Sequence, residues 1–335
     1  MRLAVLDLGS NTFHLLLAQV DLAQVDPSGS IMRLASFKRA LRLGAEVPVG
    51  GIIAHSQWQR AMQTIDEILS QGRPFDCRTL GVATSVFRDA ANGRAFVESV
   101  RMQFGVPVDL LTGTEEARLS YLGAMSELPP QQGPVAVIDV GGGSIQLTVG
   151  EGERCVLAKS LPFGVLRLCD AAAARTSDAH GVAGEIAEIL RREAKQVADA
   201  VAALRPASLV FASGTARTIA SLPLLDAYEQ TPSPRRADSP QGSLMATRVS
   251  RAALAGLGSA LIGLDADALT GLGVPPDRHT TTGPGAIALQ TLMELIGVEE
   301  ATVATRALRE GVIVRALSAA RESRPVVSAE AAPLF

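Results

Sequence analysis

Two short segments of the chain each combine a carboxylate with a turn of small residues. Residues 3–12 are LAVLDLGSNT and residues 135–144 are VAVIDVGGGS, so Asp7 and Asp139 occupy the same place in the two segments. Backbone N–H groups in a glycine-rich turn converge on one spot and suit phosphate oxygens, and hard carboxylate oxygens suit Mg²⁺ or Mn²⁺. One such turn alone would more often be only a tight hairpin, but two copies predict metal ligands at Asp7 and Asp139. The phosphate-binding residues predicted from the turns are Gly9, Ser10, Asn11, Thr12, Gly141, Gly142, Gly143 and Ser144.

Both segments have an apolar run before the turn and a second one after it. FHLLLAQV follows the first turn and IQLTVGEG follows the second, so each segment predicts a hairpin of strand, turn and strand. Two hairpins of one design, about a domain apart, indicate a duplicated architecture whose turns face each other across a cleft. Neither the Rossmann glycine pattern nor the P-loop pattern occurs, which argues against dinucleotide enzymes and P-loop NTPases.

The rest of the chain alternates between strand and helix patterns, which favours an α/β fold with a mixed or parallel sheet. Strands are predicted over 79–84, 106–111 and 207–213, and helices over 55–70, 87–103, 114–125, 184–204, 250–262, 284–296 and 305–320. The Pro/Ser-rich run 231–243 predicts a surface loop. We expect domain I over 1–126, domain II over 133–304, and a final helix over 305–322 that packs back on domain I.

Composition limits the classes of function. The chain has 335 residues, a net charge of −3 and only 4% aromatic residues, so neither a basic field nor a stacking surface for nucleic acid is indicated. Three cysteines without a CxxC pair predict neither a disulfide framework nor a zinc site. No signal peptide and no membrane span are expected, which favours a cytoplasmic protein. A polyanion site must therefore be local, and Lys38, Arg39 and Arg42 form a candidate track, although a solvated strand edge fits them equally well.

Five runs in order resemble the exopolyphosphatase/guanosine pentaphosphate phosphohydrolase (Ppx/GppA) family of the actin/hexokinase/Hsp70-like superfamily. They are DLGSNTFHLLLA, ATSVFRDA (83–90), GTEEARLSYLGA (113–124), IDVGGGSIQL (138–147) and SGTARTIA (213–220). The resemblance implies an α/β fold of two duplicated ribonuclease H-like (actin-like ATPase) domains, in the short two-domain form. It also implies an Mg²⁺-dependent hydrolase that releases orthophosphate from the end of inorganic polyphosphate. The 5′-phosphate of pppGpp is the alternative substrate, ppGpp is a further possible ligand, and a homodimer is left open.

The resemblance also assigns roles to individual residues. Glu116 corresponds to the catalytic base of the family, but physical reasoning cannot separate it from Glu115, since both begin a helix and one can be a capping-box acid. Arg88 corresponds to an arginine that grips the phosphate chain, and its alternative is a solvated helix position. Gly214 and Thr215 would lie at the distal, nucleotide side of the site.

Two positions depart from the family pattern. Gln146 stands where the family commonly has Glu, and DRHTTTGPGA follows Pro276 in place of an Arg-Ala-Asp-like run. A lost carboxylate at position 146 could weaken the metal site, so a binding or sensing protein that has lost turnover is a second hypothesis. A kinase or ATPase of the same superfamily is a third, in which SGTARTIA would contact an adenosine. His14 is expected to be a packed structural residue.

Overall fold

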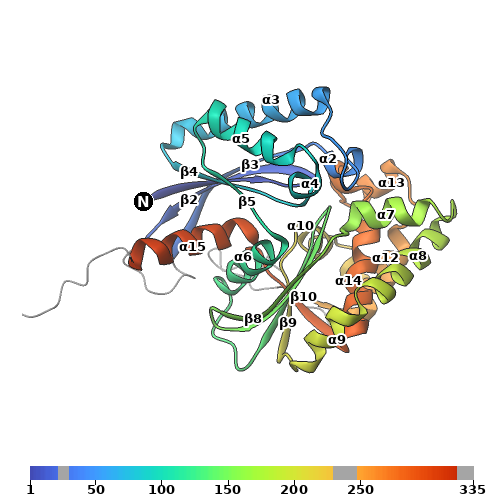
Figure 1. Ribbon diagram of the computed structural model, residues 1–335. Helices are drawn as coiled ribbons and strands as arrows, with labels where there is room; N and C mark the ends of the chain where they lie inside the picture. The colour runs from blue at the N-terminus through green and yellow to red at the C-terminus, as the bar shows by residue number, and fades with distance from the viewer. Residues whose placement is uncertain (22–29, 229–246, 323–335) are drawn as a thin grey trace, which may run out of the picture.

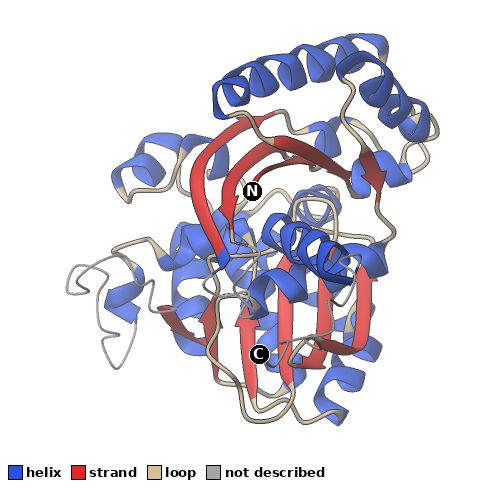
Figure 2. Cartoon of the chain, turned by 90° about the vertical axis from the view of Figure 1, so that its left-hand side faces the viewer, coloured by secondary structure: helices blue, strands red, loops and turns tan. Residues whose placement is uncertain are grey.

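The computed structural model describes residues 1–21, 30–228 and 247–322, which form two β-sheets with helices around and between them (Figures 1 and 2). The first sheet has the strand order β3-β2-β1-β4-β5, and the second has the order β10-β11-β9-β6-β7-β8. The strands of the first sheet are β1 (Arg2–Leu8), β2 (Thr12–Val20), β3 (Ile31–Ala40), β4 (Arg78–Ala83) and β5 (Val108–Leu110). Those of the second are β6 (Val135–Val140), β7 (Ile145–Glu151), β8 (Arg154–Leu161), β9 (Ser208–Phe211), β10 (Thr247–Ser250) and β11 (Glu300–Val303).

The two sheets repeat one topology. β1 pairs antiparallel with β2 and parallel with β4, and β6 pairs in the same way with β7 and β9. β3 and β8 extend the sheets on one side, β5 and β11 on the other, and among the described strands only β10 has no counterpart. The duplicated α/β fold predicted from the two hairpins is confirmed, with the hairpins β1–β2 and β6–β7 as the matching parts.

Helices cover the outer face of each sheet (Figure 1). Side chains alternate along a strand, so Ala4, Leu6 and Leu8 of β1 share one face and pack with residues of α3 and α5. On the second sheet the helices α8, α12 and α14 cover the corresponding face of β6. The helices of the first half are α2 (Leu43–Glu46), α3 (His55–Gly72), α4 (Ser85–Asp89), α5 (Gly93–Phe104) and α6 (Gly113–Met125). The later ones are α7 (Val165–Ala173), α8 (Ala179–Glu193), α9 (Lys195–Ala203), α10 (Gly214–Ala220), α11 (Leu225–Tyr228), α12 (Arg251–Leu261), α13 (Ala266–Gly271), α14 (Thr282–Ile296) and α15 (Leu308–Glu322), with 3₁₀ turns at Arg73–Phe75 and Pro276–Arg278.

Two helices lie between the sheets and join them. The inner face of β1 packs on α15 through Leu3 and Val5, whereas α6 packs on the second sheet through Tyr121 and Ala124. The two helices cross at glycines. A Cβ on Gly311 would lie 1.8 Å from the carbonyl oxygen of Leu119, and a Cβ on Gly123 would lie 1.8 Å from that of Ala307. The backbones of α6 and α15 are therefore in direct contact.

The structure corrects two element predictions. The helix expected over 87–103 is broken into α4 and α5, because the chain turns so tightly that a Cβ on Gly93 would lie 1.9 Å from the carbonyl oxygen of Phe87. The helix expected over 184–204 is α8 followed by α9, with the break at Ala194. The run 231–243 lies outside the described residues.

The domain division of the sequence stays a proposal, namely 1–126 and 133–304 with a final segment over 305–322. Each main part contains one sheet, and α15 lies against the first sheet. α6, however, belongs to the first part by sequence and packs on the second sheet. None of the helices in the described parts of the chain is long and apolar enough to cross a membrane.

Candidate active site

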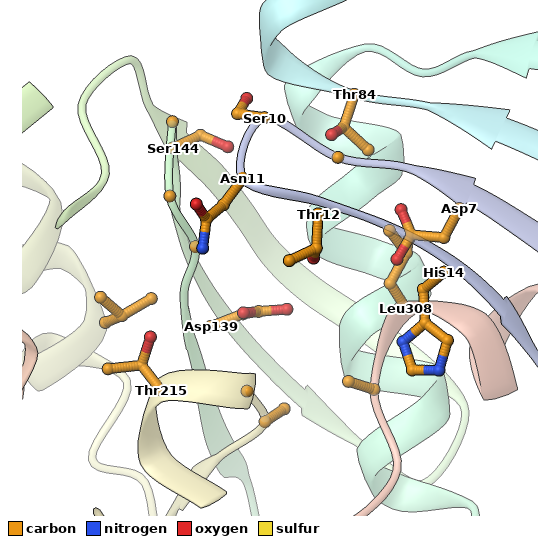
Figure 3. Close-up of a pocket in the computed structure, with 18 of the residues that line it drawn as sticks. Asp7, Ser10, Asn11, Thr12, His14, Thr84, Asp139, Ser144, Thr215 and Leu308 are labelled. Atoms are coloured by element: carbon orange, nitrogen blue, oxygen red, sulfur yellow. The ribbon is translucent and has the colours of Figure 1, made fainter. Parts of the chain in front are cut away.

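A cavity of about 430 Å³ lies between the two hairpin turns. Figure 3 shows Asp7 and Asp139, which come from opposite hairpins, directed into this space. The predicted site residues that line it are Asp7, Gly9, Ser10, Asn11, Thr12, Lys38, Glu116, Asp139, Gly141, Gly142, Gly143, Ser144, Gly214 and Thr215. Arg39, Arg42, Arg88 and Glu115 are not part of the lining. His14 and Gln146 also line the cavity.

The first turn (residues 9–12) and the second turn (residues 141–144) have the same backbone geometry. Gly9 N–H donates to the Thr12 carbonyl at 3.2 Å, and Gly141 N–H donates to the Ser144 carbonyl at 3.0 Å. The two turns also approach each other closely, since a Cβ on Gly143 would lie 2.5 Å from the hydroxyl oxygens of Ser10 and of Ser85. Each turn can therefore present backbone amides to the same phosphate group.

Three carboxyl groups line the cavity, of which Asp7 and Glu116 are buried and Asp139 is half-buried. Asp7 pairs with Arg309 at 2.9 Å, and Asp139 accepts a hydrogen bond from Ser120 at 2.7 Å. Burial raises the pKa of Asp7 and raises the pKa of Asp139 to about 6. The pKa of Glu116 is raised to about 7, mainly by burial and further by the charges of Asp139 and Asp7, against the opposing effect of Arg88. Burial therefore disfavours the ionised form of all three carboxyl groups.

Glu116 and Glu115 have different environments although they are neighbours on α6. The Oε2 atom of Glu116 accepts from Arg88 at 3.0 Å, and its Oε1 atom faces the hydroxyl of Ser144 at 3.4 Å. Glu115 is exposed and forms a capping box with Thr112, whose N–H donates to the Glu115 carboxylate at 2.7 Å. These hydrogen bonds lower the pKa of Glu115. Of the two acids, only Glu116 faces the cavity.

The residues fit a divalent cation. Mg²⁺ commonly takes one or two protein carboxylates and completes its shell with water and phosphate oxygens. Within the described residues no cluster of three or more His, Cys, Asp or Glu side chains could hold a metal ion by itself. Asp7 and Asp139 both line the cavity, and two carboxylates are a donor set of the kind that Mg²⁺ takes together with water and phosphate. Burial is the main reason why the pKa values of both carboxyl groups are raised, and a bound cation would favour their ionised forms. The buried Oδ1 atom of Asn11 also lacks a hydrogen-bond partner and provides a further oxygen nearby (Figure 3).

Basic side chains form the other part of the lining. They are Lys38, Arg217, Arg278 and Arg309, of which the sequence analysis named only Lys38. Lys38 pairs with Asp277 at 2.6 Å, and burial lowers the pKa of Arg217 to about 10. The Nε atoms of Arg278 and Arg309 are buried and have no hydrogen-bond partner, although that of Arg278 lies 3.8 Å from the carboxylate of Asp277. Arg217 lies within the run SGTARTIA and Arg278 within DRHTTTGPGA, but each arginine comes from a different element and only the fold brings them together.

The remaining candidates have other contacts. Arg88 donates to the Leu111 carbonyl at 2.9 Å as well as to Glu116. Arg42 donates to Thr280 at 3.0 Å, and Arg39 donates to the carbonyl of Lys38. His14 is hydrogen-bonded to Ser36, and burial lowers the pKa of its imidazole to about 2, so the ring is neutral.

Comparison with known proteins agrees with this architecture. The sequence model of the Ppx/GppA phosphatase family matches residues 22–320. The chain is 30% identical to an uncharacterized protein of Streptomyces coelicolor, over 94% of this chain and 90% of that protein. It is 29% identical to Exopolyphosphatase 1 of Mycobacterium tuberculosis, over 98% of this chain and 91% of that protein.

Solved structures with the same fold include the Aquifex aeolicus member of the Ppx/GppA family, with a TM-score of 0.74 at 23% identity over 97% of this chain and 99% of that one. An exopolyphosphatase from Cytophaga hutchinsonii has a TM-score of 0.79 at 21% identity, over 95% and 98% of the two chains. The fold class predicted from the sequence, two duplicated α/β units on either side of a cleft, is confirmed. The chain belongs to the Ppx/GppA phosphatase family.

Proposed function

We propose that the protein is an exopolyphosphatase, which hydrolyses the terminal phosphoanhydride of inorganic polyphosphate and releases orthophosphate with the help of Mg²⁺. The observation that carries the proposal is the cavity in which two amide-rich turns, three carboxyl groups and four basic side chains meet. The three free cysteines suit a reducing compartment, so we place the reaction in the cytoplasm.

Each part of the cavity then has a task. Mg²⁺, when bound, neutralises phosphate charge and polarises the phosphoanhydride. Asp7 and Asp139 would hold the ion, and the amides of both turns would bind oxygens of the terminal phosphate. Glu116 would take a proton from the attacking water at a carboxylate lone pair that neither Arg88 nor Ser144 occupies. Arg88 thereby orients the base, and its predicted contact with the phosphate chain stays a prediction.

The chemistry of the lining favours polyphosphate over pppGpp. None of the described residues that line the cavity is Phe, Tyr or Trp, so it offers a guanine base no stacking surface of the kind that single-stranded nucleic acids use. Lys38, Arg217, Arg278 and Arg309 instead supply positive charge for phosphates beyond the terminal one. Each phosphate of a polyphosphate chain can pair with these basic side chains, whereas the nucleoside part of pppGpp carries no charge that would do so.

Orthophosphate release from long polyphosphate, pppGpp and ATP, measured side by side with Mg²⁺ and with a chelator, tests the proposal. We expect release from polyphosphate to be fastest and to stop when the metal is removed. Faster release from pppGpp would identify a guanosine pentaphosphate phosphohydrolase. Tight polyphosphate or (p)ppGpp binding without any release would identify a sensor, and release from ATP alone would favour the ATPase hypothesis.

A further inference from the structure

Gln146 is buried in the cavity wall beside the carboxyl groups. It lies on β7 opposite Asp139 of β6 and is 2% exposed. Its amide Nε2 donates to the hydroxyl oxygen of Ser144 at 2.8 Å and lies 3.3 Å from that of Ser160. A buried amide that serves two serine hydroxyls has a defined orientation, because each of its N–H groups has its own acceptor.

The amide decides what the Ser144 hydroxyl can do. A hydroxyl has one proton to donate and lone pairs that accept. The Gln146 amide donates a hydrogen bond to the Ser144 oxygen. The hydroxyl proton of Ser144 is therefore available to be donated to Glu116. The distance from the Ser144 hydroxyl to Oε1 of Glu116 is 3.4 Å, which is long for such a bond, but bonds of this kind often tighten when substrate is bound.

We propose that Gln146 is a positioning residue that directs the proton of Ser144 toward Glu116 and so holds the base in its ionised, aimed form. The inference rests on the exopolyphosphatase function proposed above. Glu116 is then held at both oxygens, by Arg88 from α4 at Oε2 and by Ser144 from the second turn at Oε1. Gln146 does not touch the reacting atoms and acts only through Ser144.

A glutamate at position 146 would reverse this arrangement. An ionised carboxylate accepts hydrogen bonds only, so Ser144 would donate to it and turn its lone pairs toward Glu116. The groups that already act on Glu116 are Arg88 from α4, Asp139 from β6 and Asp7 from β1. One more carboxylate beside Asp139 would make ionisation of Glu116 harder. Gln146 therefore suits a site in which Glu116 is the general base, whereas a glutamate at position 146 would disfavour the ionised form of Glu116.

The test compares Gln146→Glu, Gln146→Leu, Ser144→Ala and the double variant Gln146→Leu/Ser144→Ala with the wild type. Values of kcat and KM are measured at saturating Mg²⁺ across acidic to alkaline pH, on each phosphoanhydride that the wild type cleaves. Gln103→Glu is the matched control, because it adds the same charge at an exposed position of α5.

We expect Gln146→Glu to lower kcat about 10-fold near neutral pH, with KM nearly unchanged. The acidic limb of its rate profile should move up by about one pH unit, so that activity recovers in alkali. Gln146→Leu should lower kcat with a smaller shift. The double variant should lose no more than Ser144→Ala alone, because both residues act through one chain of contacts.

Additive losses in the double variant would overturn the inference, and so would a Gln146→Glu profile that coincides with the wild type. A variant Gln146→Glu that changes only the Mg²⁺ concentration for half-maximal rate would assign position 146 to the metal site instead. These outcomes leave the proposed function intact. Failure of the wild type to release orthophosphate from polyphosphate would remove that function first.

Discussion

Glu116 and Glu115 share a position at the start of α6, so only their different environments separate their roles. Glu116→Gln keeps the shape and the bond to Arg88 but cannot accept a proton from water. We expect kcat for orthophosphate release to fall about 10²–10⁴-fold, the usual cost of losing a general base, with little change in polyphosphate affinity. Glu115→Gln removes only part of an exposed capping box, so its rate should stay near that of the wild type.

The measurement is a comparison of the two variants by phosphate release and by equilibrium binding of polyphosphate. An inactive Glu115→Gln beside an active Glu116→Gln would reverse the assignment.

Asp139 is expected to limit stability in the absence of metal. Its pKa is about 6 in the fold against an ordinary 3.8, so the neutral form is favoured by folding. Protonated Asp139 therefore contributes to the free energy of unfolding below about pH 4, and this contribution is lost as the pH rises through about 6. At pH 8 Asp139→Asn should therefore raise the free energy of unfolding by about 3 kcal/mol, while turnover falls sharply.

Unfolding of both proteins in urea with a chelator at pH 4 and pH 8 checks this, because the difference should vanish at the lower pH. An Asn variant that is less stable than the wild type at pH 8 would show that the buried charge is well compensated without metal.

The sequence predicted the residues beside the glycine turns and missed the arginines of the cavity. Asp7 and Asp139 were found because each precedes a glycine turn, and the lining of the cavity includes both. Arg217 was not singled out although it lies within the run SGTARTIA, and Arg309 lies outside the five runs; an arginine in a helix is ordinarily solvated. Their placement depends on how α10 and α15 dock, which is a property of the tertiary structure.

At the level of elements, the crossing of α6 and α15 sets the position of two site residues. Glu116 lies on α6 and Arg309 on α15, both within the first turn or two of their helices. Gly311→Ala would place a methyl group where the Leu119 carbonyl lies, and the helices would have to separate. We expect a loss of about 1–3 kcal/mol in the free energy of unfolding, and a lower kcat because Glu116 and Arg309 both shift.

Gly184→Ala is the control, because this exposed glycine of α8 has open space for a Cβ. It should stabilise the protein by about 0.5–1 kcal/mol and leave kcat unchanged. Denaturant unfolding and steady-state rates of both variants measure the contrast. Equal effects of the two substitutions would show that the crossing tolerates a methyl group.

The boundaries of an element were predicted well where the apolar repeat extends over many residues, and poorly where a single contact ends the element. α3 and α14 agree with their predicted ranges to within a few residues. The break between α4 and α5 was missed although Asn92-Gly93 is a turn-type dipeptide, whereas the close approach of Gly93 to Phe87 is visible only in three dimensions.

At the scale of the molecule, ion pairs connect the two halves across the cleft. Asp89 of α4 pairs with Arg167 of α7 at 2.7 Å, and both side chains are largely buried. Lys38 of β3 pairs with Asp277 at 2.6 Å. Each pair joins a residue near the first sheet to one near the second and favours the closed arrangement.

Arg167→Gln should therefore shift the population toward more open forms and raise KM for polyphosphate roughly 3- to 10-fold. Small-angle scattering should show a larger radius of gyration for this variant. Arg175→Gln breaks an ion pair with Glu185 that lies within the second half, so neither quantity should change. An unchanged KM in Arg167→Gln would mean that closure does not depend on the Asp89 pair.

The duplication itself was predictable, because two hairpins of one design leave a trace in the sequence. The way the halves join was only partly predictable. The return of the last helix to the first sheet was expected. The packing of α6 on the second sheet depends on Tyr121 and Ala124, and their apolar character does not indicate which sheet they contact.

The position of α15 in the chain has a consequence for synthesis. The inner face of the first sheet, with Leu3, Val5 and Leu16, is covered by apolar residues of α15, which are made some 300 residues later. The nascent protein must therefore hold an apolar sheet surface without its native cover until α15 has been made, and such surfaces are prone to aggregate. Arg309 follows the other described lining residues in the chain, so the cleft is completed only with α15, and a chain terminated just before this helix would contain both sheets without the full site.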